Sequence, residues 1–261
     1  STLLLVTLGE TLQYVRQFEA ADSQLAAVGR QDPTQIATWL VGGSNRYLTL
    51  GTVSVSEAVA ALDRAEALGA NVAETRVNIG LRAGDSSVYE RGVSGLPEDH
   101  VSDGQFTWRP IELGRARWAF ISNDTDAQRE YATRGAGRIE SWLQDNPDDD
   151  RAWQELGIAR ALAGDTAGAT AASDRGVELE PFDRDFLRAV RQLAGRVQVL
   201  ALVGRSDEAF EILDAMVDLP SGDFSTPYLL GSMPLLRPLR SDPRWEPLME
   251  RLAEPLPRPA G

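Results

Sequence analysis

The stretch from 150 to 181, DRAWQELGIARALAGDTAGATAASDRGVELEP, constrains the fold of this chain more than any other. Trp153 and the apolar residues that follow it at three- or four-residue intervals are typical of an amphipathic helix. Gly164 ends that helix, because glycine tolerates the left-handed backbone of a C-cap. Asp165 is a good N-cap for a second helix, and Pro181 stops it. The stretch therefore predicts two short helices packed as a hairpin.

The same stretch resembles the tetratricopeptide repeat, a helical hairpin with a period of about 34 residues. The positions that match its signature are Trp153, Leu156, Gly157, Ala169 and Pro181. Arg160 departs from the signature, where an aromatic residue is usual, whereas Pro147 lies one period before Pro181. An unrelated helical hairpin is the alternative interpretation.

Similar patterns recur along the chain, so the sequence predicts an array of helical hairpins and not a single one. We expect further helical pairs at 3–33, 35–70, 72–95, 106–146 and 183–220. The first helix of the pair at 35–70 should bend near Gly42, and the region 70–125 is irregular, with a loop at 96–105. A short helix after Asp242 and Pro243 would cover the open face of the last repeat.

These patterns predict an all-α fold, a right-handed α-α superhelix of about five or six hairpins with a C-terminal capping helix. We expect one repeat domain over 1–253 and a flexible, proline-rich tail over 254–261. The chain begins without Met and inside a repeat, so we expect it to be a piece of a longer polypeptide.

Composition excludes several kinds of chemistry. The formal charge is −13, from 26 basic and 39 acidic residues, so the overall field repels nucleic acid. The chain has no cysteine, no lysine and one histidine, which removes thiolate nucleophiles, Walker loops and multi-histidine metal sites. We expect no cofactor and no bound metal. No apolar run is long enough to span a bilayer, so the sequence predicts a soluble domain, cytoplasmic or periplasmic.

The last 120 residues or so resemble the C-terminal repeat region of multidomain bacterial signalling proteins, and the segment LRSDPRWEPL is the most specific part of this likeness. In those families the repeats follow a Ser/Thr kinase, an adenylyl cyclase or a winged-helix regulator, often beyond a membrane anchor. The resemblance implies a sensory or partner-binding module without enzymatic activity. A membrane-anchored parent chain and a homodimer stay open.

In such a superhelix the first helix of each pair lines the concave groove, where polar side chains bind an extended or helical peptide. We expect this role for Glu10, Gln13, Tyr14, Gln17, Arg151, Gln154, Glu155, Arg191 and Gln198. Trp108, beside Arg109 and near the 96–105 loop, is a candidate exposed anchor for a partner. The alternative is that these are ordinary solvated helix faces and that the tryptophan packs inside.

Three weaker alternatives remain. A small-molecule sensor would place a pocket in the irregular region 70–125. The acidic run Asp148–Asp150 offers oxygen ligands for a hard cation, but it is more typical of a helix-capping turn. His100 lies among loop carboxylates, as a general base would, yet no nucleophile accompanies it. An enzyme is therefore the least favoured interpretation.

Overall fold

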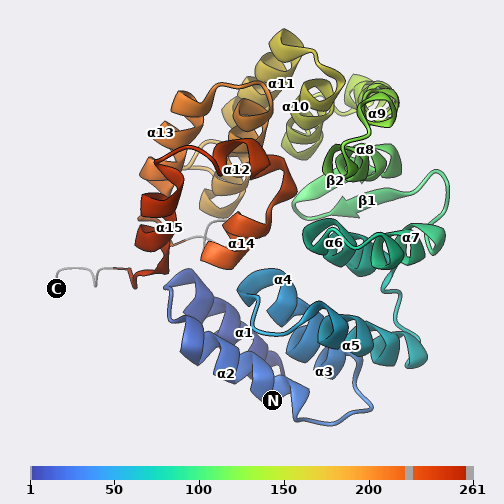
Figure 1. Cartoon of the computed structure of the whole chain (residues 1–261), viewed down its shortest axis with the longest axis vertical. Helices are drawn as coiled ribbons and strands as arrows, with labels where there is room; N and C mark the ends of the chain where they lie inside the picture. The colour runs from blue at the N-terminus through green and yellow to red at the C-terminus, as the bar shows by residue number, and fades with distance from the viewer. Residues whose placement is uncertain (1, 221–225, 257–261) are drawn as a thin grey trace. The chain divides into compact units, whose positions relative to one another are not determined.

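The computed structural model describes residues 2–220 and 226–256, and this part of the chain is helical apart from one short β-hairpin (Figure 1). The all-α prediction is confirmed, and the repeat residues Leu156 and Leu213 are each 1% exposed. Contacts divide the chain into two compact units. Unit 1 comprises Ser1–Leu96, Val217–Met233 and Met249–Gly261, and unit 2 comprises Pro97–Met216 and Pro234–Leu248. A single repeat domain over 1–253 stays a prediction, and most of the predicted tail, residues 257–261, lies outside the described residues.

Unit 1 is a series of helices that pack chiefly on their neighbours in sequence. They are α1 (Thr2–Tyr14), α2 (Phe18–Gly29), α3 (Ile36–Trp39), the π-helix η1 (Leu40–Asn45), α4 (Arg46–Leu50), α5 (Val55–Ala67), α6 (Ala73–Ala83), α7 (Ser86–Ser94) and α14 (Pro227–Ser232). The pairs α1–α2 and α6–α7 form the predicted hairpins.

Local chemistry explains the main boundaries of unit 1. Ser54 and Glu57 form a capping box at the start of α5, and Gly84 ends α6 with a φ of 64°. The predicted bend near Gly42 is the π-helix itself. A Cβ atom on Gly42 would lie 2.5 Å from the Cα atom of Gly29 in α2, so only glycine allows this approach.

Unit 2 contains the β-hairpin and the most regular helical pairs. Its elements are β1 (Val101–Gly104), β2 (Thr107–Pro110), α8 (Ile111–Ser122), α9 (Thr125–Asp145), α10 (Asp150–Ala163), α11 (Thr166–Leu179), α12 (Phe186–Leu202), α13 (Ser206–Met216) and the 3₁₀-helix η2 (Pro234–Leu239). A final helix, α15 (Trp245–Ala253), begins in unit 2 and ends in unit 1. Helix α10 packs on α9, α11 and α12, so the hairpins stack side by side.

The predicted hairpin at 150–181 is confirmed as α10 and α11. Gly164 has a φ of 92°, and the Asp165 carboxylate accepts a hydrogen bond from the Gly168 amide at 2.9 Å. A Cβ on Gly157 would lie 3.2 Å from the Ala169 carbonyl oxygen, which explains this glycine inside a helix. Trp153 is only half-buried, and its indole N–H donates to the Pro147 carbonyl at 2.8 Å.

The prediction that a helix begins near Phe106 is wrong. Strands β1 and β2 pair antiparallel over 101–110, with Asp103 opposite Trp108, and α8 begins only at Ile111. Because a residue before proline is biased toward extended backbone, Pro110 favours a strand conformation at Arg109. Pro110 itself is the N-cap of α8.

The end of unit 2 packs onto the last helical pair, as expected of a capping segment. The Arg244 guanidinium lies 4.3 Å from the centre of the Phe210 ring in α13 and 2.9 Å from an oxygen of Asp207. Trp245, at the start of α15, is 4% exposed.

Candidate functional site

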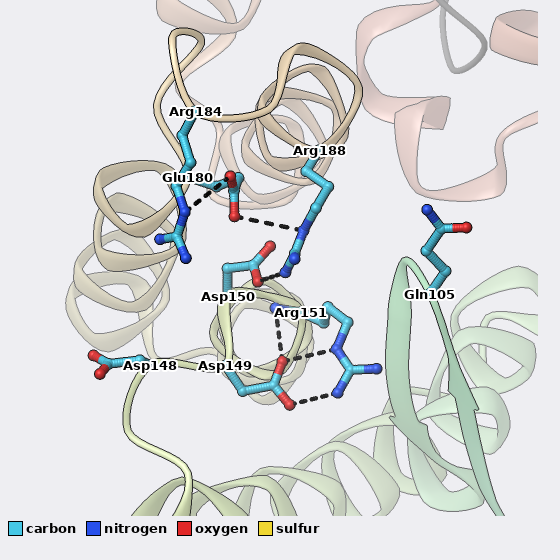
Figure 2. Close-up of a pocket in the computed structure, with 8 residues that line it drawn as sticks. All are labelled: Gln105, Asp148, Asp149, Asp150, Arg151, Glu180, Arg184 and Arg188. Atoms are coloured by element: carbon cyan, nitrogen blue, oxygen red, sulfur yellow. Dashed lines mark hydrogen bonds and ion pairs between the residues drawn. The ribbon is translucent and has the colours of Figure 1, made fainter.

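A charged pocket of about 320 Å³ lies in unit 2 at the N-terminal end of α10 (Figure 2). Its residues come from the turns between consecutive helices, from the first turns of α10 and α12 and from the tip of the β-hairpin. They are Gln105, Asp148, Asp149, Asp150, Arg151, Glu180, Arg184 and Arg188. Asp148 and Arg184 have side chains that are 81% and 66% exposed, so the pocket opens to solvent.

Asp149 forms the floor of the pocket as the N-cap of α10. Its carboxylate accepts from the amides of Arg151 and Ala152, at 3.2 and 3.4 Å, and from the Trp142 indole at 3.0 Å. Burial alone would raise the pKa of Asp149, but the hydrogen bonds from Arg151 and Trp142 outweigh it, and the pKa is lowered. The capping function predicted for the acidic run is therefore present, and the first amides of α10 already have an anionic partner.

Arg151 joins this helix to the β-hairpin. It donates to both carboxylate oxygens of Asp149, at 2.9 and 2.8 Å, and to Asp103 and the Gly104 carbonyl, at 2.9 and 2.7 Å. The hydrogen bonds with Asp149, and to a lesser extent those with Asp103, raise the pKa of Arg151. The side chain predicted to contact a peptide is thus engaged within the unit.

Asp150 and Glu180 are buried carboxylates on the opposite wall. Asp150 is 3% exposed and accepts from Arg188 and, at 2.8 Å, from the amide of Gln192. Glu180, the C-cap of α11, is also 3% exposed. Its two nearest guanidinium nitrogens are Nε of Arg188, 3.5 Å from Oε2, and Nε of Arg184, 3.7 Å from Oε1.

A second charged cluster lies deeper in unit 2, around Glu155. Arg109 donates two hydrogen bonds to Oε1 of Glu155, at 2.9 and 2.7 Å, and Arg117 donates one to Oε2 at 2.8 Å. Burial would raise the pKa of Glu155, but the charges of Arg109 and Arg117 lower it below its usual value, with a smaller contribution from Arg191. Burial and the charge of Arg109 lower the pKa of Arg117 to about 9, so its guanidinium is still charged at neutral pH.

The structure changes the interpretation of several predicted contact residues in unit 2. Arg109, Glu155 and Arg191 are brought together, but in an internal ion-pair cluster rather than on an open groove. Gln154 is 7% exposed and lies against Gly195 of α12, and Gln198 donates to the Ala194 carbonyl of its own helix.

The prediction of Trp108 as an exposed anchor is wrong. It is 6% exposed and stacks on Trp142, with ring centres 4.8 Å apart. The β-hairpin turns its ring into the core of unit 2, where it packs with Leu113 and Leu156.

Of the predicted residues of unit 1, Gln13 does not face solvent. Glu10 and Gln17 are exposed, and Tyr14 is half-buried. Gln13 is 4% exposed and donates to the Thr49 hydroxyl at 3.1 Å, so it ties α1 to α4 instead of facing solvent.

Sequence reasoning missed four residues of the pocket: Gln105, Glu180, Arg184 and Arg188. Gln105, Glu180 and Arg184 lie in turns or at a helix end and Arg188 in the first turn of α12, whereas most of the predicted residues lie along helix faces. The one indication in the sequence was Glu180, the acidic residue directly before the proline that ends the second helix of the repeat.

Neither a metal site nor a membrane span is found in the part of the chain that the structure describes. Over 2–220 and 226–256 no group of three or more His, Cys, Asp or Glu side chains could hold a metal ion. Over the same residues, no helix has the length and apolar character needed to cross a membrane.

Comparisons with known proteins add little to this geometry. No protein-family profile matches the sequence. No curated protein matches it either. A similar solved structure is that of PilW, described as a widely conserved type IV pilus biogenesis factor, with 16% identity and a TM-score of 0.42 over 82% of this chain and 91% of that chain. Because that TM-score is below 0.5, the all-α assignment rests on the helices of this chain alone.

Proposed function

We propose that this chain is a non-catalytic helical-repeat scaffold that binds a segment of a protein partner at the charged pocket of unit 2. The stacked hairpins α8–α9, α10–α11 and α12–α13 support it, because such arrays present extended surfaces built from successive repeats. The resemblance of the last 120 residues to signalling proteins supports the same role within a larger signalling chain.

The observation that carries the proposal is the origin of the pocket. Its lining combines two inter-helix turns with the tip of a β-hairpin that interrupts the repeat pattern. A partner segment lying across these turns would contact several consecutive repeats at once. In unit 2 the helix residues that the sequence suggested for binding make internal contacts, so the polar groups available to a partner lie near the turns.

The lining also favours a protein segment over a small metabolite. Small-molecule sites are mostly apolar with a few polar groups, whereas seven of the eight residues here are charged. The predicted small-molecule pocket within 70–125 gains no support, since Gln105 is the one lining residue from that region. The carboxylates Asp149 and Asp150 are held by Arg151 and Arg188, an arrangement that suits recognition better than proton transfer.

The test is peptide selection from a random library displayed on phage, with the whole chain as bait. Gln105 is exposed at the hairpin tip, so Gln105→Trp should obstruct the pocket without disturbing the core. Thr133→Trp, at an exposed position in α9, is the matched control. Selected peptides should bind wild type and Thr133→Trp equally and lose at least about tenfold in affinity on Gln105→Trp, since a blocked hot spot removes about 1.4 kcal/mol or more. Equal binding to wild type and both variants would show that the peptides do not bind at the pocket, and would contradict the proposal.

A further inference from the structure

Glu180 is the one buried pocket carboxylate whose hydrogen bonding is incomplete among the residues that the structure describes. Its Oε1 atom is buried and accepts no hydrogen bond from any described residue. A carboxylate oxygen with a charged donor normally has one at about 2.7–2.9 Å, and leaving it without one in a buried site is unfavourable. The neighbouring carboxylates show the difference, because Asp149 accepts from Arg151 at 2.8 and 2.9 Å.

The two arginines beside Glu180 make their hydrogen bonds to other acceptors and only long ion pairs to Glu180. Arg188 donates to Asp150, whereas its Nε, 3.5 Å from Oε2 of Glu180, is buried and donates to no described residue. Arg184 donates to the Leu179 carbonyl at 3.0 Å, and its Nε is 3.7 Å from Oε1 of Glu180. Figure 2 shows Arg184 beside Glu180 at the edge of the pocket. Since 66% of its side chain is exposed, Arg184 can turn outward at little cost.

The charges of the pocket favour a cationic ligand. Four carboxylates line it against three guanidinium groups, and the chain as a whole carries −13. An anion would find the N-terminal amides of α10 already bonded to Asp149. A cation would be attracted by the field of the whole protein and would meet an acceptor at Glu180.

We propose that the pocket receives an arginine side chain of the partner segment, whose guanidinium donates to Glu180 and displaces the guanidinium of Arg184. This inference rests on the proposed function and specifies the partner's chemistry. Arginine fits better than lysine, because its planar fork can donate to a carboxylate through two parallel N–H groups. The volume of about 320 Å³ is at the small end of ligand sites, which suits one side chain rather than a whole metabolite.

The test uses an acetylated and amidated peptide, Gly-Ser-Arg-Ser-Gly, and two analogues with lysine or citrulline at the centre. Affinities are measured by chemical-shift titration of the ¹⁵N-labelled chain. The arginine peptide should bind at least about tenfold more tightly than the citrulline peptide, since citrulline keeps the shape but loses the charge. The lysine peptide should lie between them. Equal affinities for arginine and citrulline would overturn the proposal.

Two variants with opposite expected effects sharpen the test. Glu180→Gln should weaken arginine-peptide binding at least about tenfold, whereas Arg184→Ala should strengthen it about threefold or more by removing the competing cation. Glu178→Gln is the matched control, because Glu178 lies on the same helix with a side chain that is 67% exposed, and it should leave affinity unchanged. Weaker binding by Arg184→Ala would show that Arg184 contacts the partner rather than yielding to it, and would also overturn the proposal.

The variants separate this inference from the proposed function. If phage-selected peptides lose binding on Gln105→Trp but contain no excess of arginine and ignore Glu180→Gln, the scaffold function stands and the arginine inference fails. If the same peptides ignore Gln105→Trp as well, both fail. Circular dichroism melts of each variant confirm that a loss of binding reflects the pocket and not unfolding.

Discussion

Replacing the buried carboxylate of Glu155 with the neutral amide of glutamine should strongly destabilise unit 2. Glu155 is 3% exposed and accepts three hydrogen bonds at 2.7–2.9 Å from Arg109 and Arg117. Glu155→Gln keeps the shape but removes the negative charge, leaving Arg117, 9% exposed, beside the like charge of Arg109. Breaking a buried ion pair by removing one partner typically costs about 3–5 kcal/mol, and we expect a loss in this range.

The measurement is urea unfolding followed by circular dichroism at 222 nm, at pH 7 and 0.15 M NaCl. The matched control is Glu140→Gln, because Glu140 also pairs with an arginine, Arg160, at 2.8 Å, but its side chain is 48% exposed. An exposed pair of this kind contributes about 0–1 kcal/mol, so the control should be nearly as stable as wild type. A loss below about 1 kcal/mol for Glu155→Gln would refute the assignment of a strong buried pair.

The pH dependence provides a second check on Glu155. Its pKa is lowered in the folded chain, because the charges of Arg109 and Arg117 outweigh the effect of burial. A carboxylate of this kind stabilises the fold above its unfolded pKa of about 4.3, and this contribution is lost as the pH falls through the lower folded value. The difference in unfolding free energy between wild type and Glu155→Gln should therefore shrink as the pH falls below about 4.3, and a constant difference would contradict the argument.

Three further predictions concern stability and use the same urea assay. Gly80→Ala should lower the free energy of unfolding by about 1–3 kcal/mol, because the new Cβ atom would lie 2.5 Å from the backbone nitrogen of Tyr89 and push α6 away from α7. An unchanged urea midpoint would mean that the two helices can move apart without loss of stability. Trp108→Ala should cost about 3–5 kcal/mol through loss of the buried stack on Trp142, so a loss below 1 kcal/mol would place the ring in solvent. Asp149→Ala should cost about 0.5–2 kcal/mol as a lost N-cap, whereas Asp149→Asn should keep most of that stability; equal losses would assign the effect to charge instead.

Helix boundaries were the most predictable feature of this chain. Gly164 and Asp165, and likewise Gly84 and Asp85, end one helix and cap the next as their side chains and backbone preferences require. These effects act within a few residues, so they can be read from adjacent sequence letters.

The β-hairpin and the charged sites were much harder to predict from the sequence. Phe106, Trp108 and Ile111 follow one another at two and three residues, spacings that suit a strand and a helix respectively, and the strand that pairs with 107–110 lies at 101–104. Glu155 shows the same limit, since a polar residue on a helix face looks solvated until Arg109 and Arg117, far away in sequence, are brought against it.

The amino-acid order alone was enough to establish that this chain folds as stacked helical hairpins, because turns, caps and apolar spacing are local properties. Which carboxylates are buried, which arginines neutralise them and where a pocket opens depended on the packing of Gln105, Asp150 and Glu180 from three separate segments of the chain. Contacts between distant segments set burial and charge pairing, and no short window of sequence contains them.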